Sequence, residues 1–328
     1  MFKYILKRIG ISILILLGVS FILYALLRCM PTDFIRQRID ALSTSGVTVT
    51  EEFVQQMYKT YGLDGNIIEG YFGWLKNVVR LDFGKSFITE RSVVSDIFNP
   101  NRIGTSFLVA AVATVFEFMI AIPLGITAAT HQYSIRDYVV TVLVMIGISL
   151  PSFFFGRTLQ YIFGVKLQWF PISGVTSAGY TLTGIDKVLD YLRCMCLPIL
   201  TVVILSIGGR MRTTRTNMLE VLNSDYIRTA RAKGLSESKV IYKHAFRNTM
   251  IPLVTSLAGL IPSLFSGAMI TEQVFDLPGI GSYAINAMTQ ADIPVIMMYN
   301  MFLACLSVMG VLLADLMYGI VDPRVKLA

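Results

Sequence analysis

The stretch Ile103–Thr130 reads IGTSFLVAAVATVFEFMIAIPLGITAAT and carries one charged residue, Glu117. A helix needs about 20 mostly apolar residues to cross the roughly 30 Å hydrocarbon core of a bilayer, so this stretch predicts a membrane-spanning helix. The composition of the whole chain agrees, because 54% of its 328 residues are hydrophobic and only 15% are charged. An ordinary soluble domain has about 25% charged residues. The chain therefore belongs among integral membrane proteins.

Five further apolar stretches predict spans on either side of this one. They are Ile9–Leu27, Tyr138–Gly164, Leu197–Gly209, Met250–Ile270 and Val295–Ile320. Leu197–Gly209 is short for a span, and we expect it to extend back to Leu192 and forward into the basic stretch that follows. The first apolar stretch follows Lys3, Lys7 and Arg8 like a signal peptide, but no small-x-small cleavage site follows it, so we expect a retained anchor. The sequence thus predicts an all-α membrane fold with six transmembrane helices.

The distribution of lysine and arginine predicts the orientation of these spans. Nine basic residues against three acidic ones lie between Arg210 and Arg247, whereas the segment from Glu272 to Asp292 has acidic residues and no basic ones. Short cytoplasmic loops carry the positive excess in membrane proteins. We therefore expect the loop 210–247 to face the cytoplasm, and six spans then place both termini on the cytoplasmic side of the membrane.

The segment between the first two spans is the only expected loop large enough to fold outside the membrane. It carries apolar and aromatic residues such as Tyr58, Tyr71 and Trp74 at loosely helical spacing. We expect a small helical external subdomain over residues 31–101. The rest of the chain is expected to form a first transmembrane helix over residues 1–30 and a five-helix core over residues 102–328. This core contains the loop 210–247.

Several other signals for catalysis or ligand binding are weak. The four cysteines and two histidines lack the spacing of a zinc site or a disulfide scaffold, although Cys194 and Cys196 could bind a metal or form a bridge. Gly84-Lys85-Ser86 resembles the end of a phosphate-binding loop, but the glycine required five residues earlier is replaced by Val79. The basic loop 210–247 also fits the outline of a DNA-binding helix-turn-helix, but its place between two spans argues against nucleic acid as a partner.

Glu117 lies in the middle of its span, where an ionised carboxylate costs about 2.5 to 3.5 kcal/mol unless it faces the protein interior. We expect it to point inward and to make a structural hydrogen bond; a proton relay or a cation site is the alternative. An ion-coupled carrier should show several intramembrane acids and bases, and only Glu117 lies deep. Asp315 is expected to have a similar structural role near Arg324.

The stretch Asn223–Pro252, NSDYIRTARAKGLSESKVIYKHAFRNTMIP, is the most informative polar segment. Asn223 or Ser224 can cap a short helix, and Gly234 stands where a left-handed C-cap would end it. The apolar face of this helix would hold Tyr226, Ile227 and Ala230, and a second helix would follow through Val240 and Ala245. A short amphipathic element that displays Tyr226 and Ile227 to water suits a groove on a soluble partner.

These residues resemble a known family. Its coupling loop is matched by Asp225-Tyr226-Ile227-Arg228-Thr229-Ala230-Arg231-Ala232-Lys233-Gly234-Leu235, with His244-Ala245 and Arg247-Asn248 after it. Further matches are Leu17-Gly18-Val19-Ser20, Leu81-Asp82-Phe83-Gly84-Lys85-Ser86, Ile122-Pro123-Leu124-Gly125, Trp169-Phe170-Pro171 with Gly174, Phe275 with Pro278-Gly279-Ile280-Gly281, and Asp322-Pro323-Arg324. The ordered set resembles the ABC importer permeases of the dipeptide/oligopeptide/nickel family, in particular their B-type (OppB/DppB-like) subunits.

The resemblance implies a type I ABC importer permease fold and a set of partners. These are a homologous C-type permease subunit, two ATP-binding subunits, an extracytoplasmic solute-binding protein and membrane lipid. ATP and Mg²⁺ would be bound by the ATPase subunits, with no cofactor and no catalytic site in this chain. Coupling to the ATPases would fall on Asp225, Tyr226, Ile227, Arg228, Thr229, Ala230, Arg231, Lys233, Gly234 and Leu235. Ala230 and Gly234 match the family's small residues that permit close docking.

The chain departs from the pattern at two points. Arg228-Thr229-Ala230 replaces the glutamate of the general coupling signature, and Pro31-Thr32-Asp33-Phe34 replaces the family's Pro-Gly-Asp-Pro after the first span. Peptides are the expected cargo, and nickel or another small solute is the alternative.

Overall fold

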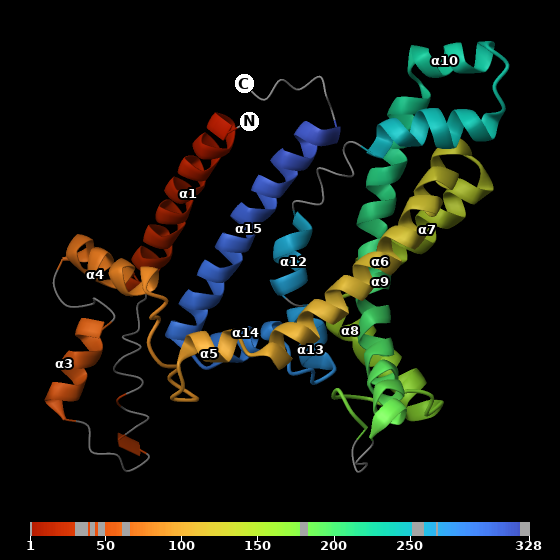
Figure 1. Cartoon of the computed structure of the whole chain (residues 1–328). Helices are drawn as coiled ribbons and strands as arrows, with labels where there is room; N and C mark the ends of the chain where they lie inside the picture. The colour runs from red at the N-terminus through yellow and green to blue at the C-terminus, as the bar shows by residue number, and fades with distance from the viewer. Residues whose placement is uncertain are drawn as a thin grey trace. The chain divides into compact units, whose positions relative to one another are not determined.

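The computed structural model describes residues 2–29, 39, 43–44, 50–60, 66–177, 183–250, 259–266 and 268–321. Regular secondary structure in this part of the chain is helical, apart from one isolated antiparallel bridge between Lys85 and Ser92 (Figure 1). The chain forms two compact units, one of residues 1–103 and 283–309 and the other of residues 104–282 and 310–327. The all-α fold expected from the sequence is confirmed.

Among the described residues, four helices are long and apolar enough to cross a membrane. They are α1 (Phe2–Arg28), α6 (Pro100–Thr130), α9 (Gly184–Leu222) and α15 (Ile293–Val321), and their most apolar windows have mean hydropathies of 2.0 to 2.6. The expected span Met250–Ile270 includes residues 251–258 and 267, which lie outside the described residues. The described part of it holds α12 (Leu260–Ser266) and the start of α13 (Met269–Val274).

The third expected span, Tyr138–Gly164, is not a straight helix. It consists of α7 (Ile135–Ser149) and α8 (Ser152–Leu159), and α8 continues into the π-helix η1 (Gln160–Lys166). The two parts meet at an angle of 100°. The break has a local cause, because Pro151 pushes Leu150 into an extended conformation (ψ 130°) and cannot donate a backbone hydrogen bond.

The fourth span extends backward beyond Leu192 and forward into the basic stretch, so its expected extension in both directions is confirmed. Helix α9 has 39 residues and continues through Arg210 and Arg215 to Leu222. At 1.5 Å per residue its length is about 58 Å, well beyond the thickness of the hydrocarbon core. The first part of the expected loop 210–247 is therefore a continuation of this helix.

The first unit is organised around aromatic side chains between α1 and α4 (Ile67–Val79). The rings of Tyr24 and Trp74 lie 5.6 Å apart, and the Ser20 and Tyr71 hydroxyls are hydrogen-bonded at 2.8 Å. Helices α3 (Glu51–Thr60), α5 (Val93–Ile97) and most of α14 (Ile280–Thr289) complete the described helical elements of this unit besides α15. The described part of the segment after the first span holds α3, α4 and α5, and residues 80–92 between α4 and α5 form a non-helical turn that contains the bridge between Lys85 and Ser92. Its folding as an external subdomain stays a prediction.

A second anchor in the first unit joins the loop after α4 to the turn before α15. The buried carboxylate of Asp292 accepts hydrogen bonds from the Ser86 hydroxyl at 2.5 Å and from the Phe87 amide at 3.0 Å. Ser86, at the end of the sequence that resembled a phosphate-binding loop, is thus held in a structural turn.

The second unit packs α6, α7 and α9 closely through small residues. A Cβ atom at Gly125 would lie 2.7 Å from Thr214, and one at Gly208 would lie 2.3 Å from Ile148. Buried Ala121, Ala128, Val144 and Met211 fill the space between these helices. In a bilayer no hydrophobic driving force brings helices together, because lipid tails are as apolar as the side chains. Small residues at a helix interface let the two backbones approach closely enough for van der Waals packing to hold them.

Candidate coupling site

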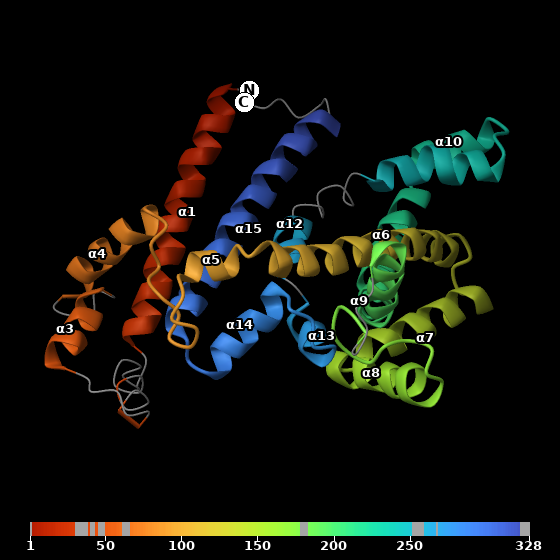
Figure 2. The ribbon, with the colours of Figure 1, turned by 60° about the horizontal axis from the view of Figure 1, so that its bottom comes forward.

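The short helix α10 (Asp225–Ala232) follows the end of α9, and η2 (Lys239–Phe246) runs back beside it. Figures 1 and 2 show α10 at one end of α9 and α8 at the other. Helix α10 ends at Lys233, and Gly234 has a φ of +75°, as the C-cap prediction requires. Ser224 occupies the N-cap position, but its hydroxyl donates to the Val221 carbonyl at 2.6 Å and does not cap α10.

The inner face of α10 is buried within the chain. Ile227 is 0% exposed, and Ala230 is 7% exposed. Both pack in a cluster whose other buried members come from α6, α9 and the η2 segment: Ile126, Ala129, Met218, Val240 and Ala245. The expectation that Ile227 is displayed to water is therefore wrong, since this side chain fixes α10 to the end of the long helix. The small side chain of Ala230 lies at the contact between α10 and the other helices of this chain.

The outer face of α10 is exposed and charged. We use this name for Asp225, Tyr226, Arg228, Thr229 and Lys233, all of which are exposed. The side chains of Asp225 and Arg228 are 97% and 73% exposed and lie 3.5 Å apart. Such an exposed pair contributes at most about 1 kcal/mol to stability. The outer face is therefore free to exchange its charge contacts with another molecule at low cost.

The turn after α10 is held by Arg231 and Glu237. Their closest atoms, Arg231 Nη2 and Glu237 Oε1, lie 2.7 Å apart, and Arg231 Nε also donates to the same carboxylate at 3.1 and 3.2 Å. Leu235 lies between them in sequence and packs against the buried cluster. The buried cluster packs α10 and η2 against the end of α9, and the exposed ion pair adds at most about 1 kcal/mol to this contact.

The intramembrane acid Glu117 has a partner that the sequence reading missed. Arg210 Nε donates to Glu117 Oε1 at 3.0 Å, and the two side chains are 17% (Arg210) and 12% (Glu117) exposed. The Arg210 guanidinium also lies 4.5 Å from the centre of the Phe118 ring. The expectation of an inward-facing, structurally bonded Glu117 fits this geometry. Arg210 was counted as a loop residue because the end of α9 could not be located by hydropathy.

A second ion pair joins α7 to the same helix. Arg215 donates to both carboxylate oxygens of Asp137, at 2.9 and 2.8 Å, and the Tyr133 amide donates to Asp137 at 3.0 Å. Asp137 is buried. With Glu117, this gives two acid–arginine contacts along α9 just before α10. Asp315 lies on α15, and its expected partner Arg324 is outside the described residues.

Sequence reading also missed a buried acid in α13. Glu272 is 0% exposed; it accepts from the Ser106 hydroxyl at 2.7 Å and from the Ser282 amide at 2.8 Å. A Cβ atom at Gly279 would lie 2.2 Å from a Glu272 oxygen. This contact explains why glycine occurs in the Pro278-Gly279-Ile280-Gly281 stretch. Burial raises the pKa of Glu272, and its hydrogen bonds with Ser106 and with backbone amides partly oppose the effect.

No group of three or more histidine, cysteine, aspartate or glutamate side chains in the described part of the chain could hold a metal ion. Cys194 is buried and Cys196 is exposed, and both are free thiols.

The fold defines a multi-pass membrane protein in which the long helix α9 carries the short helices α10 and η2 at one end. Residues 121–327 match the family described as the binding-protein-dependent transport system inner membrane component, and residues 1–111 match the N-terminal family of the same membrane components. The chain belongs to this family of ABC importer permeases. The resemblance found in the sequence is thereby confirmed.

Curated relatives cover the chain almost completely. It is 36% identical over 326 residues to the oligopeptide transport system permease protein AppB of Bacillus subtilis (strain 168), covering 99% of this chain and 100% of the relative. A putative peptide permease protein of Brucella ovis is 35% identical over 329 residues, with 99% of each chain covered. The dipeptide transport system permease protein DppB of Bacillus subtilis (strain 168) is 32% identical over 329 residues, with 100% of this chain and 99% of the relative covered.

Proposed function

We propose that this chain conducts peptides as one half of the translocation pathway of an ATP-driven importer. Relatives named as oligopeptide, dipeptide and peptide permeases match it from end to end, which supports peptides as cargo over nickel or another small solute. A homologous C-type permease supplies the other half of the pathway. An extracytoplasmic solute-binding protein delivers the peptide.

We infer that the outer face of α10 docks on an ATPase subunit. The observation that supports this inference is the exposure of its charged side chains at the end of α9. Asp225, Tyr226, Arg228, Thr229 and Lys233 supply contacts, while Ile227 and Ala230 hold the helix to its own chain. Leu235 joins the same packing, and Arg231 pairs with Glu237 across the turn at Gly234. A partner that moves α10 would therefore move α9 with it, because packed interfaces shift between discrete arrangements.

ATP and Mg²⁺ are bound by the two ATPase subunits, and this chain binds no cofactor of its own. With six spans, a cytoplasmic α10 implies that both termini also lie on the cytoplasmic side. The positive charge of the segment 210–247 supports this orientation. The two acid–arginine contacts join α9 to α6 and to α7, so α9 would pass a movement of α10 on to these membrane-spanning helices.

The substitution Gly234→Trp tests the docking surface. A Cβ atom at Gly234 would meet nothing within 4 Å, so a large side chain fits the isolated chain. The positive φ costs about 1–2 kcal/mol. Gly184→Trp is a matched control, because Gly184 also has a positive φ (+65°) and open space, but lies at the other end of α9.

The assay is ATP-driven uptake of a labelled peptide by proteoliposomes that contain the permease pair, both ATPases and the binding protein. We expect Gly234→Trp to reduce uptake at least tenfold while the protein is inserted in normal amount, and Gly184→Trp to retain uptake. Equal uptake by the two variants would contradict docking at α10.

A further inference from the structure

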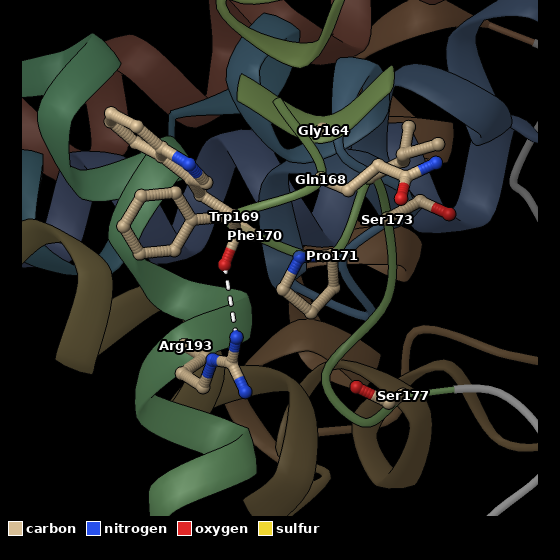
Figure 3. A pocket seen from close by; sticks show the side chains of 9 residues that line it. Gly164, Gln168, Trp169, Phe170, Pro171, Ser173, Ser177 and Arg193 are labelled. Carbon is tan, nitrogen blue, oxygen red and sulfur yellow. Dashed lines mark hydrogen bonds between the residues drawn. The ribbon is translucent and has the colours of Figure 1, made fainter. Parts of the chain in front are cut away.

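A cavity of about 460 Å³ opens at the end of α9 opposite to α10. It is lined by Trp169, Phe170 and Pro171 from the loop after η1, by Ser177 from the same loop, and by Arg193 from α9. Figure 3 shows the aromatic residues on one side of the pocket and Ser173 and Ser177 on the other, with Pro171 between them. Its volume lies within the range of small-ligand sites.

Hydrogen bonds to neighbouring backbone groups hold the loop that forms the walls of this pocket. The Trp169 amide donates to the Phe163 carbonyl at 2.8 Å, and the Gln160 side chain donates to the Ile172 carbonyl at 2.7 Å. Gln168, at the rim, has a φ of +54°, a conformation that residues other than glycine seldom adopt. The preceding helix η1 is a π-helix, and such helices occur frequently at functional sites. A preorganised wall lowers the entropy cost of binding.

Arg193 supplies a positive charge at the pocket, and this charge also attracts the nearby Asp190 carboxylate. Its Nη2 donates to the Trp169 carbonyl at 3.0 Å, which aims the guanidinium at the loop (Figure 3). No carboxylate lies within ion-pair distance of Arg193 among the described residues. The nearby Asp190 is occupied by the Ser177 amide, at 2.8 Å, and by the Ser177 hydroxyl. The other N–H groups of Arg193 remain suited to an anionic ligand, and a planar guanidinium fits a carboxylate best.

We propose that this pocket receives the C-terminal carboxylate of a short peptide. Arg193 binds the carboxylate, and Trp169 and Phe170 contact the last side chain, for which an apolar or aromatic residue fits best. Ser173 and Ser177 offer hydroxyl oxygens to the peptide backbone. This inference rests on the proposed function, because the position opposite to α10 is the delivery side only if α10 faces the ATPases.

The test uses the full chain in lipid nanodiscs and follows the fluorescence of Trp169, which is 55% exposed. The contribution of the other tryptophan, Trp74, is removed by subtracting the signal of the Trp169→Phe variant. The probes are the dipeptide Ala-Phe with a free C-terminus and the same dipeptide with a C-terminal amide. We expect a saturable change with the free acid and at least tenfold weaker binding of the amide.

Arg193→Gln should weaken binding of the free acid at least tenfold, whereas Lys187→Ala should leave it unchanged. Lys187 is an exposed cation on the same helix and lies outside the pocket. Equal binding of acid and amide, full binding by Arg193→Gln, or no saturable change with either probe would overturn the proposal. A fluorescence change that requires Arg193 but appears only when the solute-binding protein is added without peptide would also overturn the proposal. The pocket would then receive a carboxylate of that protein.

These outcomes can be separated from a failure of the proposed function, because binding is measured without ATP. Gly234→Trp should leave the binding of Ala-Phe unchanged. Loss of peptide binding together with normal ATP-driven uptake would refute the pocket alone, and normal binding in a chain that never shows ATP-driven uptake would refute the proposed function alone.

Discussion

The contact between Glu117 and Arg210 should be a stabilising interaction that a double-mutant cycle can measure. The two side chains are 12% and 17% exposed, and their closest atoms lie 3.0 Å apart. Removal of one partner from a buried pair costs about 3–5 kcal/mol because the other charge stays uncompensated. We expect about 2–3 kcal/mol here, because both groups retain some exposure.

The two single variants should differ in a defined direction. Glu117→Ala removes the ion pair and leaves the contact between Arg210 and Phe118, so its cost should be about 2–3 kcal/mol. Arg210→Ala also removes that cation–π contact and should cost about 3–4 kcal/mol. The double variant should cost no more than Arg210→Ala, which gives a coupling energy of about 2–3 kcal/mol.

The assay is equilibrium unfolding in mixed micelles, followed by circular dichroism, for the wild type, both single variants and the double variant. The exposed pair Arg231–Glu237 provides the control cycle, since its side chains are 44% and 58% exposed. Its coupling energy should be at most about 1 kcal/mol. Additive costs at Glu117 and Arg210 would refute the reasoning, and so would a coupling energy no larger than that of the control.

Three further outcomes are expected from thermal unfolding in detergent. Asp137→Asn should lower the unfolding free energy by about 2–4 kcal/mol, because the substitution breaks the two-bond contact with Arg215. Gly279→Ala should destabilise by about 2–3 kcal/mol through collision with Glu272, whereas Gly73→Ala, in an open position of α4, should be neutral or stabilising by up to about 1 kcal/mol. Burial raises the pKa of Glu272, so the folded protein holds the proton on this carboxyl more tightly than the unfolded chain does. The unfolding free energy should therefore fall as the pH rises through the range in which carboxyl groups ionise. Glu272→Gln should flatten this pH dependence.

The sequence predicted most of the membrane-spanning architecture, because hydropathy reports directly on transfer to lipid. It failed where local backbone chemistry decided the outcome. Pro151 breaks the third span into two helices, although proline within other spans, such as Pro123 in α6, is accommodated in a continuous helix. The sequence predicted that α9 continues into the basic stretch but did not locate its end at Leu222, because a helix that continues beyond its apolar residues loses the hydropathy signal before it ends.

The candidate coupling site was predicted in outline and not in the roles of its residues. Gly234 identified the end of α10, since the left-handed conformation has a recognisable sequence signature. The burial of Ile227 could not be read from the loop, because it depends on the distant residues Ile126 and Met218. Arg210 was missed for the same reason, since its contact with Glu117 joins residues far apart in the sequence. Pairings between distant helices require a structure.

The most direct test of the account is cross-linking from the outer face of α10 in the assembled transporter. Arg228→Cys, labelled with a photoactivatable cross-linker, projects from a site where the side chain is 73% exposed. Lys187→Cys at the other end of α9 is the control. The account predicts cross-links from position 228 to an ATPase subunit, with a yield that changes when ATP is added, and none to that subunit from position 187. Cross-links from position 228 to lipid alone, or to the binding protein, would contradict it.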